Sequence, residues 1–129
     1  MKRKVLLVED SKTSAAIMQL ELDALGYECI LATDGKEAIK KAKDELPDLI
    51  LMDMSLPKMD GLQATQEIRK IPETQKVPII ALTARAMPGD KEKCLQAGCD
   101  EYLVKPVSHR DLGPRVENLI QAKKGSPPR

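Results

Sequence analysis

Five short runs of mainly aliphatic residues recur along the chain, and this repetition is the strongest constraint on its fold. Each run is too short to form a buried helix, and none alternates polar with apolar residues as a strand with one solvent-exposed face does. Uninterrupted runs of this length are typical of strands that are covered on both faces of a parallel sheet. The runs occupy residues 5–8, 29–32, 49–52, 77–82 and, in a weaker form, 102–104.

Segments with helical periodicity separate these runs. The first segment carries its apolar residues mostly on one stripe, and Gly26 follows it where a C-terminal cap is expected. In the second segment, Asp34 and Glu37 have the spacing of a capping box, and Pro47 marks the end of the helix. The stripe of the first segment consists of Ala15, Ile17, Met18, Leu20, Leu22 and Leu25.

Three further helices are predicted from their start and stop signals. The first begins at Asp60 or Gly61. Pro88 is expected in the first turn of the second, which ends at Gly98, and the last helix begins at Ser108. The predicted ranges are 60–71, 88–98 and 108–122.

Strand and helix therefore alternate five times. Parallel strands joined by right-handed helical crossovers form an α/β, doubly wound five-stranded parallel sheet, which is the flavodoxin-like (βα)5 architecture. A chain of 129 residues is the length of one domain, which we assign to residues 1–124, with a disordered tail at 125–129. In such a sheet a ligand binds beyond the carboxyl ends of the strands, at a switch in strand order.

The composition excludes several classes of protein. A hydrophobic share of 42% with 32% charged residues excludes disorder throughout the chain, and a net charge of +1 provides no global field that recruits nucleic acid or anionic membrane. No apolar run approaches the roughly 20 residues of a membrane span. Cys29, Cys94 and Cys99 lack the spacing of zinc or redox sites, so we expect reduced thiols in a soluble, cytoplasmic protein.

Polar and charged residues stand at the ends of four predicted strands. Glu9 and Asp10 follow the first strand, Asp53 the third, Thr83 the fourth and Lys105 the fifth. Two like charges about 4 Å apart repel by roughly 4 kcal/mol at an effective dielectric near 20, so three carboxylates need a cation or a raised pKa. Few, partly hydrated oxygen donors suit magnesium, and a divalent ion with a phosphoryl group is the predicted ligand.

Each of these residues also has a purely structural explanation when it is taken alone. Asp10 and Asp53 are then turn formers or helix caps, Thr83 is a cap, and Lys105 is a solvated surface charge. Their placement at the same edge of one predicted sheet favours a common site.

The motifs that hold these residues resemble the receiver domain of bacterial two-component response regulators, of the single-domain chemotaxis or cell-cycle type. The resemblance extends from Lys4 to about Ile120. The motifs are VEDS at residues 8–11, DMSLPKMDG at 53–61, LTA at 82–84 and VKP at 104–106.

This resemblance implies a phosphoacceptor and a metal site. Asp53 would be the modified residue, which receives a phosphoryl group from a sensor histidine kinase or a histidine phosphotransfer protein. Magnesium would be held by Glu9, Asp10, Asp53 and the backbone carbonyl of Ser55, with Glu9 acting directly or through a bound water.

The resemblance also implies the remaining catalytic and switch residues. Lys105 would pair with Asp53 before transfer and with a phosphoryl oxygen afterwards, and Thr83 would donate its hydroxyl to another oxygen. The Lys105–Pro106 peptide bond would be cis. Thr83 and Tyr102 match the family's switch residues, although a half-buried Tyr102 with its hydroxyl in water is the alternative. The signalling surface would comprise the fourth helix, the fifth strand and the fifth helix.

Several positions carry structural expectations or depart from the family pattern. Ala84 is small enough to leave the site open, while Pro57 and Gly61 shape the loop after the acceptor. Gly113-Pro114 falls inside the last predicted helix, so that helix is expected to begin late or to kink. Arg85 is a long cation near the site entrance.

Three functions are consistent with these residues. The first is a phosphorylation-switched module that signals through altered protein–protein contact and catalyses only its own phosphorylation and dephosphorylation, so that it is not an enzyme. The second is an aspartyl-phosphate phosphatase, which would want an acid where Ser55 stands. The third is a constitutive binding module. We predict the first, with no nucleic acid or membrane partner; a receiver excised from a hybrid sensor kinase would have the same sequence features.

His109 is expected to cap a helix or to face solvent.

Overall fold

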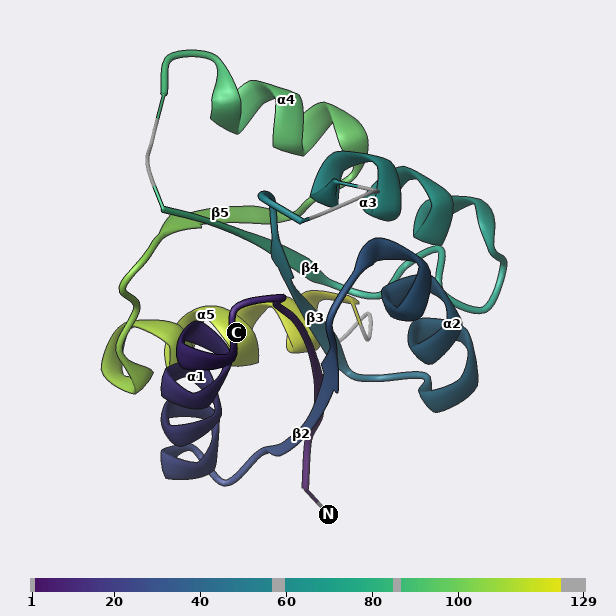
Figure 1. Ribbon diagram of the computed structural model, residues 1–129. Helices are drawn as coiled ribbons and strands as arrows, with labels where there is room; N and C mark the ends of the chain where they lie inside the picture. Colours follow the sequence, from purple (N-terminus) through teal and green to yellow (C-terminus); the bar gives the residue numbers. More distant parts are fainter. Residues whose placement is uncertain (1, 57–59, 85–86, 124–129) are drawn as a thin grey trace.

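The strands form one parallel sheet with helices on both sides. A computed structural model describes residues 2–56, 60–84 and 87–123 (Figure 1). The strand order is β2-β1-β3-β4-β5, and all four neighbouring pairs are parallel. The order reverses between β1 and β3, which places the switch point of a doubly wound sheet there. The predicted fold class is therefore confirmed.

The elements follow the predicted order along the chain. The strands are β1 (Lys4–Val8), β2 (Glu28–Ala32), β3 (Leu49–Asp53), β4 (Ile79–Thr83) and β5 (Glu101–Val104). The helices are α1 (Lys12–Ala24), α2 (Gly35–Glu45), α3 (Gly61–Lys70), α4 (Asp90–Ala97) and α5 (His109–Lys123). Proline cannot donate to a ladder, and β4 accordingly begins after Pro78 rather than at residue 77.

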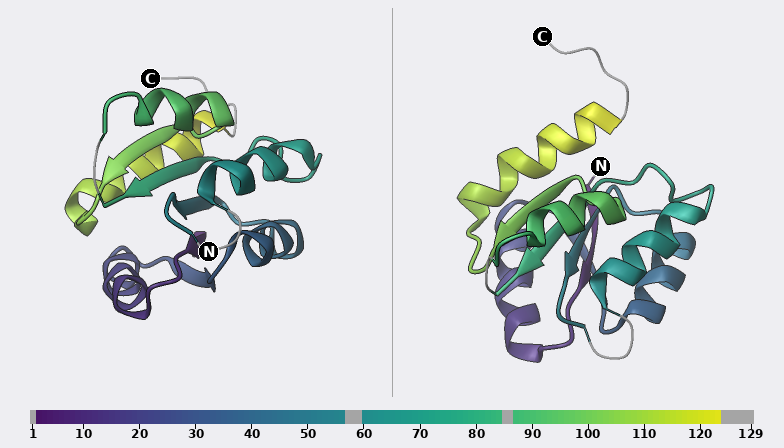
Figure 2. Two further views of the ribbon diagram at one scale, coloured as in Figure 1. Left: turned by 45° about the horizontal axis from the view of Figure 1, so that its top comes forward. Right: turned by 90° about the horizontal axis from the view of Figure 1, so that it is seen from above.

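Two hydrophobic layers explain why the strands read as continuous apolar runs. Helices α1 and α5 cover one face of the sheet, and α2, α3 and α4 cover the other, as Figures 1 and 2 show. Along β1, Val5 and Leu7 pack in the layer with α1 and α5, whereas Leu6 and Val8 pack in the opposite layer. Since successive side chains of a strand point to opposite faces, both sets must be apolar.

Side-chain caps fix the first turns of three helices near the carboxyl edge of the sheet. The amide of Glu37 donates to Asp34 Oδ1 at 2.8 Å, which confirms the predicted start of α2, and Asp60 caps α3 in the same way. The return bond of the expected capping box differs, because Glu37 Oε1 accepts from the amide of Thr33 at 2.7 Å. Ser11 caps α1.

The predicted start of α4 is wrong. Pro88 was expected in the first helical turn, but α4 begins at Asp90. Gly89 stands between them with φ +85°, a left-handed conformation that a right-handed helix cannot include. Among the residues that the structure describes, no side chain caps this helix, which has 8 residues.

The predicted apolar stripe of α1 is wrong in part. Ala15, Met18 and Leu22 are buried, but Ile17 is 51% exposed and Leu20 is 68% exposed. The buried residues follow a spacing of three to four, and the two exposed residues lie off that stripe.

The last helix does not begin late. Although Pro114 lies inside it, α5 starts at His109. The backbone amides of Asp111 and Leu112 donate hydrogen bonds to the Ser108 carbonyl and close its first turn. Gly113 permits close contact with α1, because a Cβ atom there would lie 2.9 Å from Leu25 Cδ2. Pro57, Arg85 and the tail at 125–129, which carry further predictions, lie outside the described residues.

The three cysteines form no disulfide, as expected. Burial raises the pKa of the Cys99 thiol to about 12, which disfavours its reactive thiolate. No helix among the described residues combines the length and apolar character that crossing a membrane requires.

Arg69 connects three segments at the amino edge of the sheet. Its guanidinium donates to the carbonyls of Val77 at 2.6 Å and Gly98 at 2.9 Å, and it pairs with Asp100 Oδ2 at 3.0 Å. The same Asp100 oxygen accepts from the amide of Ile79 at 2.9 Å. The starts of β4 and β5 are therefore fixed to α3 by one side chain, which is 17% exposed.

Replacing Arg69 by Met should destabilise the domain by about 2–4 kcal/mol, because carbonyls and a carboxylate lose their charged donor. Urea unfolding followed by circular dichroism measures this loss. Lys70→Met is the control, since Lys70 makes an exposed pair with Glu67 and should change stability by less than about 0.5 kcal/mol. Equal stabilities of the two variants would contradict this role of Arg69.

Candidate functional site

The parallel register brings the predicted site residues to one edge of the sheet. Val8 of β1 pairs with Met52 of β3, so the residues that follow them, Glu9 and Asp53, come at the same level of the sheet. Asp53 also pairs with Leu82 of β4. Parallel strands end at the same edge, and the switch between β1 and β3 places both carboxylates there.

Three carboxylates form a compact cluster at this edge. One oxygen from each of Glu9, Asp10 and Asp53 lies within 4.8 Å of the others. Glu9 is 2% exposed and Asp53 is 4% exposed, whereas Asp10 is exposed. Two charges are thus largely removed from water, and the third stands at the entrance.

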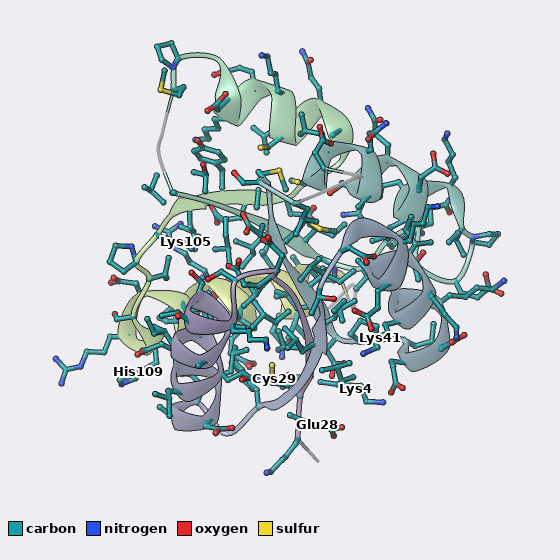
Figure 3. The ribbon with its side chains drawn as sticks, viewed as in Figure 1. Lys4, Glu28, Cys29, Lys41, Lys105 and His109 are labelled. Carbon is teal, nitrogen blue, oxygen red and sulfur yellow. The ribbon has the colours of Figure 1, made fainter. Side chains whose placement is uncertain are left out.

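Lys105 neutralises part of this charge, although its closest partner differs from the expected one. Its Nζ lies 2.8 Å from Glu9 Oε1 and 3.7 Å from Asp53 Oδ2. The primary contact of Lys105 is therefore Glu9, the more deeply buried carboxylate, with Asp53 second. Figure 3 labels Lys105 where the chain leaves β5.

The peptide bond between Lys105 and Pro106 is cis, as predicted. The amide of Lys105 also donates to the Thr83 carbonyl at 2.7 Å. This bond fixes the backbone of Lys105 to the end of β4.

Backbone amides orient the buried carboxylates. The Ser55 amide donates to Asp53 Oδ1 at 3.0 Å, and the Ser11 amide donates to Glu9 Oε2 at 3.2 Å. Gly61 allows α3 to approach this backbone, because a Cβ atom there would lie 2.6 Å from the Asp53 carbonyl oxygen. The resemblance assigned Gly61 to shaping this loop, and the close approach gives that assignment a physical basis.

Burial raises the pKa of Glu9 above its ordinary value. Desolvation is the largest cause, Lys105 opposes it, and the neighbouring carboxyl of Asp53 adds to it. The cluster is therefore under electrostatic stress whenever both carboxylates are ionised.

The donor set fits a small divalent cation. Carboxylate oxygens are hard ligands, and one exposed carboxylate beside two buried ones leaves coordination positions for water and a further oxygen, as magnesium prefers. Asp10, Glu9 and Asp53 are the described side chains that would hold it. The Ser55 carbonyl stays a predicted ligand.

Thr83 and Tyr102 lie together beside the cluster. They line, with Asp90, a hollow of about 250 Å³ under α4. The Tyr102 hydroxyl oxygen is buried, so the alternative with this hydroxyl in water is wrong. Burial raises the pKa of Tyr102, the Asp90 charge acts in the same direction, and Thr83 opposes them.

Sequence reasoning missed two features of the site. Asp90, at the start of α4, lines a second hollow of about 310 Å³ together with Ser55 and Thr83. No local pattern distinguishes Asp90 from an ordinary helix-start residue. The Lys105–Glu9 contact was also missed, because both carboxylates stand at the same predicted edge and spacing does not rank them.

Comparison with known proteins gives the family. Residues 5–117 match the response regulator receiver domain. The chain belongs to this family. The receiver domain of the Pseudomonas aeruginosa sensor histidine kinase PA1611 has the same fold, with a TM-score of 0.87 and 42% sequence identity to this chain. The match covers 93% of this chain and 98% of that receiver domain. The PA1611 structure is described with a magnesium ion coordinated in its active site cleft.

Curated relatives place receiver domains of this kind in different proteins. The polar-differentiation response regulator DivK of Brucella anthropi is 41% identical over 84% of this chain and 88% of its own length. The alkaline phosphatase synthesis transcriptional regulatory protein PhoP of Bacillus subtilis is 39% identical over 94% of this chain, which spans 50% of that protein. The hybrid signal transduction histidine kinase G of Dictyostelium discoideum is 51% identical over 84% of this chain, a segment that spans 3% of that protein.

Replacing Asp53 by Asn should stabilise the receiver domain in the absence of magnesium. Asn retains the acceptor for the Ser55 amide and removes one charge beside Glu9, so we expect a gain of about 1 kcal/mol, or about 4 °C in Tm, at pH 7. Thermal unfolding in a chelating buffer measures it.

This gain should shrink in acid. The pKa of Glu9 is raised on folding, so the cost of ionising this residue is present above that pKa and disappears as the pH falls and Glu9 becomes protonated. Asp60→Asn is the isosteric control, because Asn also caps helices and Asp60 lies outside the cluster. A lower Tm for Asp53→Asn at pH 7 would contradict the repulsion argument.

Proposed function

We propose that this receiver domain is a phosphorylation switch, with Asp53 as the acceptor of a phosphoryl group from a histidine kinase or a histidine phosphotransfer protein. The observation that carries the proposal is the single cluster in which buried Asp53 lies beside Glu9, Asp10 and the Lys105 ammonium. The phosphoryl group is transferred to the domain's own side chain and the phosphodonor is the one other reactant, so we do not propose an enzyme.

The transfer is an in-line displacement at phosphorus. A carboxylate oxygen of Asp53 forms the new P–O bond while the P–N bond of the phosphohistidine breaks, and the leaving imidazole keeps the electron pair of that bond. The Ser55 amide holds Oδ1 of Asp53, and this bond orients the carboxylate for attack.

Charge stabilisation is the main task of the other site residues. The Lys105 ammonium, which lies 3.7 Å from Asp53 Oδ2, is placed to contact a phosphoryl oxygen once Asp53 is modified. Thr83 lines a hollow together with Ser55, and its hydroxyl would donate to another phosphoryl oxygen. Magnesium, held by Glu9, Asp10, Asp53 and the Ser55 carbonyl, would neutralise the negative charge that bars a phosphoryl group from an acidic pocket.

The proposed output is a change of surface around α4 and β5. Thr83 and Tyr102 share the hollow under α4, so a movement of Thr83 towards a phosphoryl group changes the space available to the Tyr102 ring. The proposed target is a partner protein, in the cytoplasm. DivK and the hybrid signal transduction histidine kinase G are both similar to this chain, so a free-standing regulator and a part of a hybrid kinase are both compatible settings.

The phosphatase alternative gains no support from the site. Ser55 stands two residues after Asp53, where such an enzyme would want a general acid, and its amide is engaged with Asp53 Oδ1. A constitutive module without phosphorylation would not need Glu9, Asp10 and Asp53 in one cluster.

Incubation with magnesium and acetyl phosphate should produce an acid-stable, alkali-labile adduct on Asp53, because a small phosphodonor bypasses the kinase. Mass spectrometry of the intact protein and its peptides measures the adduct. Asp53→Asn should abolish it, while Asp44→Asn, an exposed surface change, should leave it intact. Absence of an adduct on the native protein, or its persistence in Asp53→Asn, would refute the proposed switch.

Magnesium should bind and stabilise the unphosphorylated domain. At ten to thirty times its Kd the ion should add about 1–2 kcal/mol, a gain that removal of the ion by EDTA reverses. Asp10→Asn should raise the Kd by about tenfold or more, since it deletes the exposed ligand. Isothermal titration calorimetry and thermal unfolding measure both effects. An unchanged Kd in Asp10→Asn would exclude Asp10 as a ligand.

A further inference from the structure

The loop between β5 and α5 connects Lys105 to a contact that the proposed function does not use. The loop begins at Lys105, whose backbone is fixed to Thr83, and ends at His109, the first residue of α5. Figure 3 labels both ends, and Figure 1 shows the loop running down to the start of α5 beside α1.

Glu21 of α1 binds the far end of this loop twice. Its Oε1 accepts from the backbone amide of His109 and lies 2.8 Å from the Nδ1 atom of the same residue. His109 was expected to cap a helix or to face solvent, but its side chain is 43% exposed and contacts Glu21 of another helix.

The surroundings make this contact favourable. The first amides of a helix lack partners within the helix, and a carboxylate at this positive end is stabilised by the helix dipole. The two bonds from His109 lower the pKa of Glu21 and therefore keep it ionised. Ser108 Oγ accepts from the amide of Asp111 at 3.3 Å, so a separate side chain serves the next part of the first turn.

The same helix forms a wall beside Lys105. Ile17 and Met18 of α1 line a groove of about 310 Å³ whose opposite wall is Lys105, Pro106 and Val107. Glu21 stands one turn further along α1 from these residues. The two contacts between Glu21 and His109 therefore connect α1, one wall of the groove, to the end of the loop that forms the other.

From this geometry we infer that Glu21 and His109 form a positioning pair, which fixes the β5–α5 loop against α1 and so holds the Lys105 ammonium in place for phosphoryl transfer to Asp53. The inference rests on the proposed function. Among the described residues, no hydrogen bond or salt bridge joins Glu21 or His109 to the acidic cluster, so the proposed effect is on the position of Lys105.

The test is a kinetic comparison with acetyl phosphate. Glu21→Ala should lower the maximal rate of Asp53 phosphorylation about three- to tenfold, because a misplaced cation stabilises the transition state less well. The Kd for magnesium should stay within about twofold, since the metal ligands are untouched. Glu21→Gln retains Oε1 as an acceptor and should recover most of the rate, whereas His109→Ala should resemble Glu21→Ala.

A double-mutant cycle with Lys105→Ala separates positioning from general stability. In the Lys105→Ala background, Glu21→Ala should change the residual rate by less than about 1.5-fold, because the group that it positions is gone. Glu45→Ala is the matched control: it breaks another ion pair between elements, with Lys4 at 3.6 Å, and should leave the rate unchanged. Thermal unfolding verifies that each variant is folded, and His109→Ala replaces Glu21→Ala if that variant is not.

The outcomes distinguish the two proposals. A native protein that acetyl phosphate does not modify would overturn the proposed function and this inference with it. A native protein that is modified, with Glu21→Ala at the native rate, would overturn the inference alone. An equal rate loss from Glu21→Ala in the native and the Lys105→Ala backgrounds would also overturn the inference, because the pair would then be purely structural.

Discussion

The burial of Glu9 and Asp53 side by side is the constraint on which the site depends. The two carboxylates are almost fully removed from water, and one ammonium, on Lys105, reaches both of them. Desolvation, together with the neighbouring carboxyl of Asp53, opposes the ionisation of Glu9 and raises its pKa. The crowded negative charge favours the binding of a cation at this site. A phosphoryl acceptor that depends on a divalent cation requires this property.

The sheet produces this arrangement at little conformational cost. Both faces of β1 and β3 are covered by helices, so residues 5–8 and 49–52 of these strands are apolar and acidic residues follow directly at their carboxyl ends. The switch in strand order leaves no crossover above these ends, and the carboxylates face each other there. Ser11, Asp34 and Asp60 then begin the next helices within a few residues.

Patterns of local origin could be predicted from the sequence, and contacts between distant segments could not. The strands and the caps at Asp34 and Asp60 follow from periodicity and from backbone donors three residues away. The exposure of Ile17 and Leu20 could not be predicted, because apolar character does not reveal which side of α1 meets the sheet. The contacts of Lys105 with Glu9 and of His109 with Glu21 each join segments more than 80 residues apart, and nothing within either segment specifies its partner.

These distant contacts are unevenly distributed, and that distribution bears on how a signal would travel. At the amino edge, Arg69 and Asp100 fix the starts of β4 and β5, and at the carboxyl edge Glu21 fixes the start of α5. Helix α4 has no side-chain cap among the described residues and covers a hollow that contains the buried Tyr102 hydroxyl. Under the proposed function, a displacement at Thr83 would be transmitted to α4, because this helix covers the hollow that Thr83 lines.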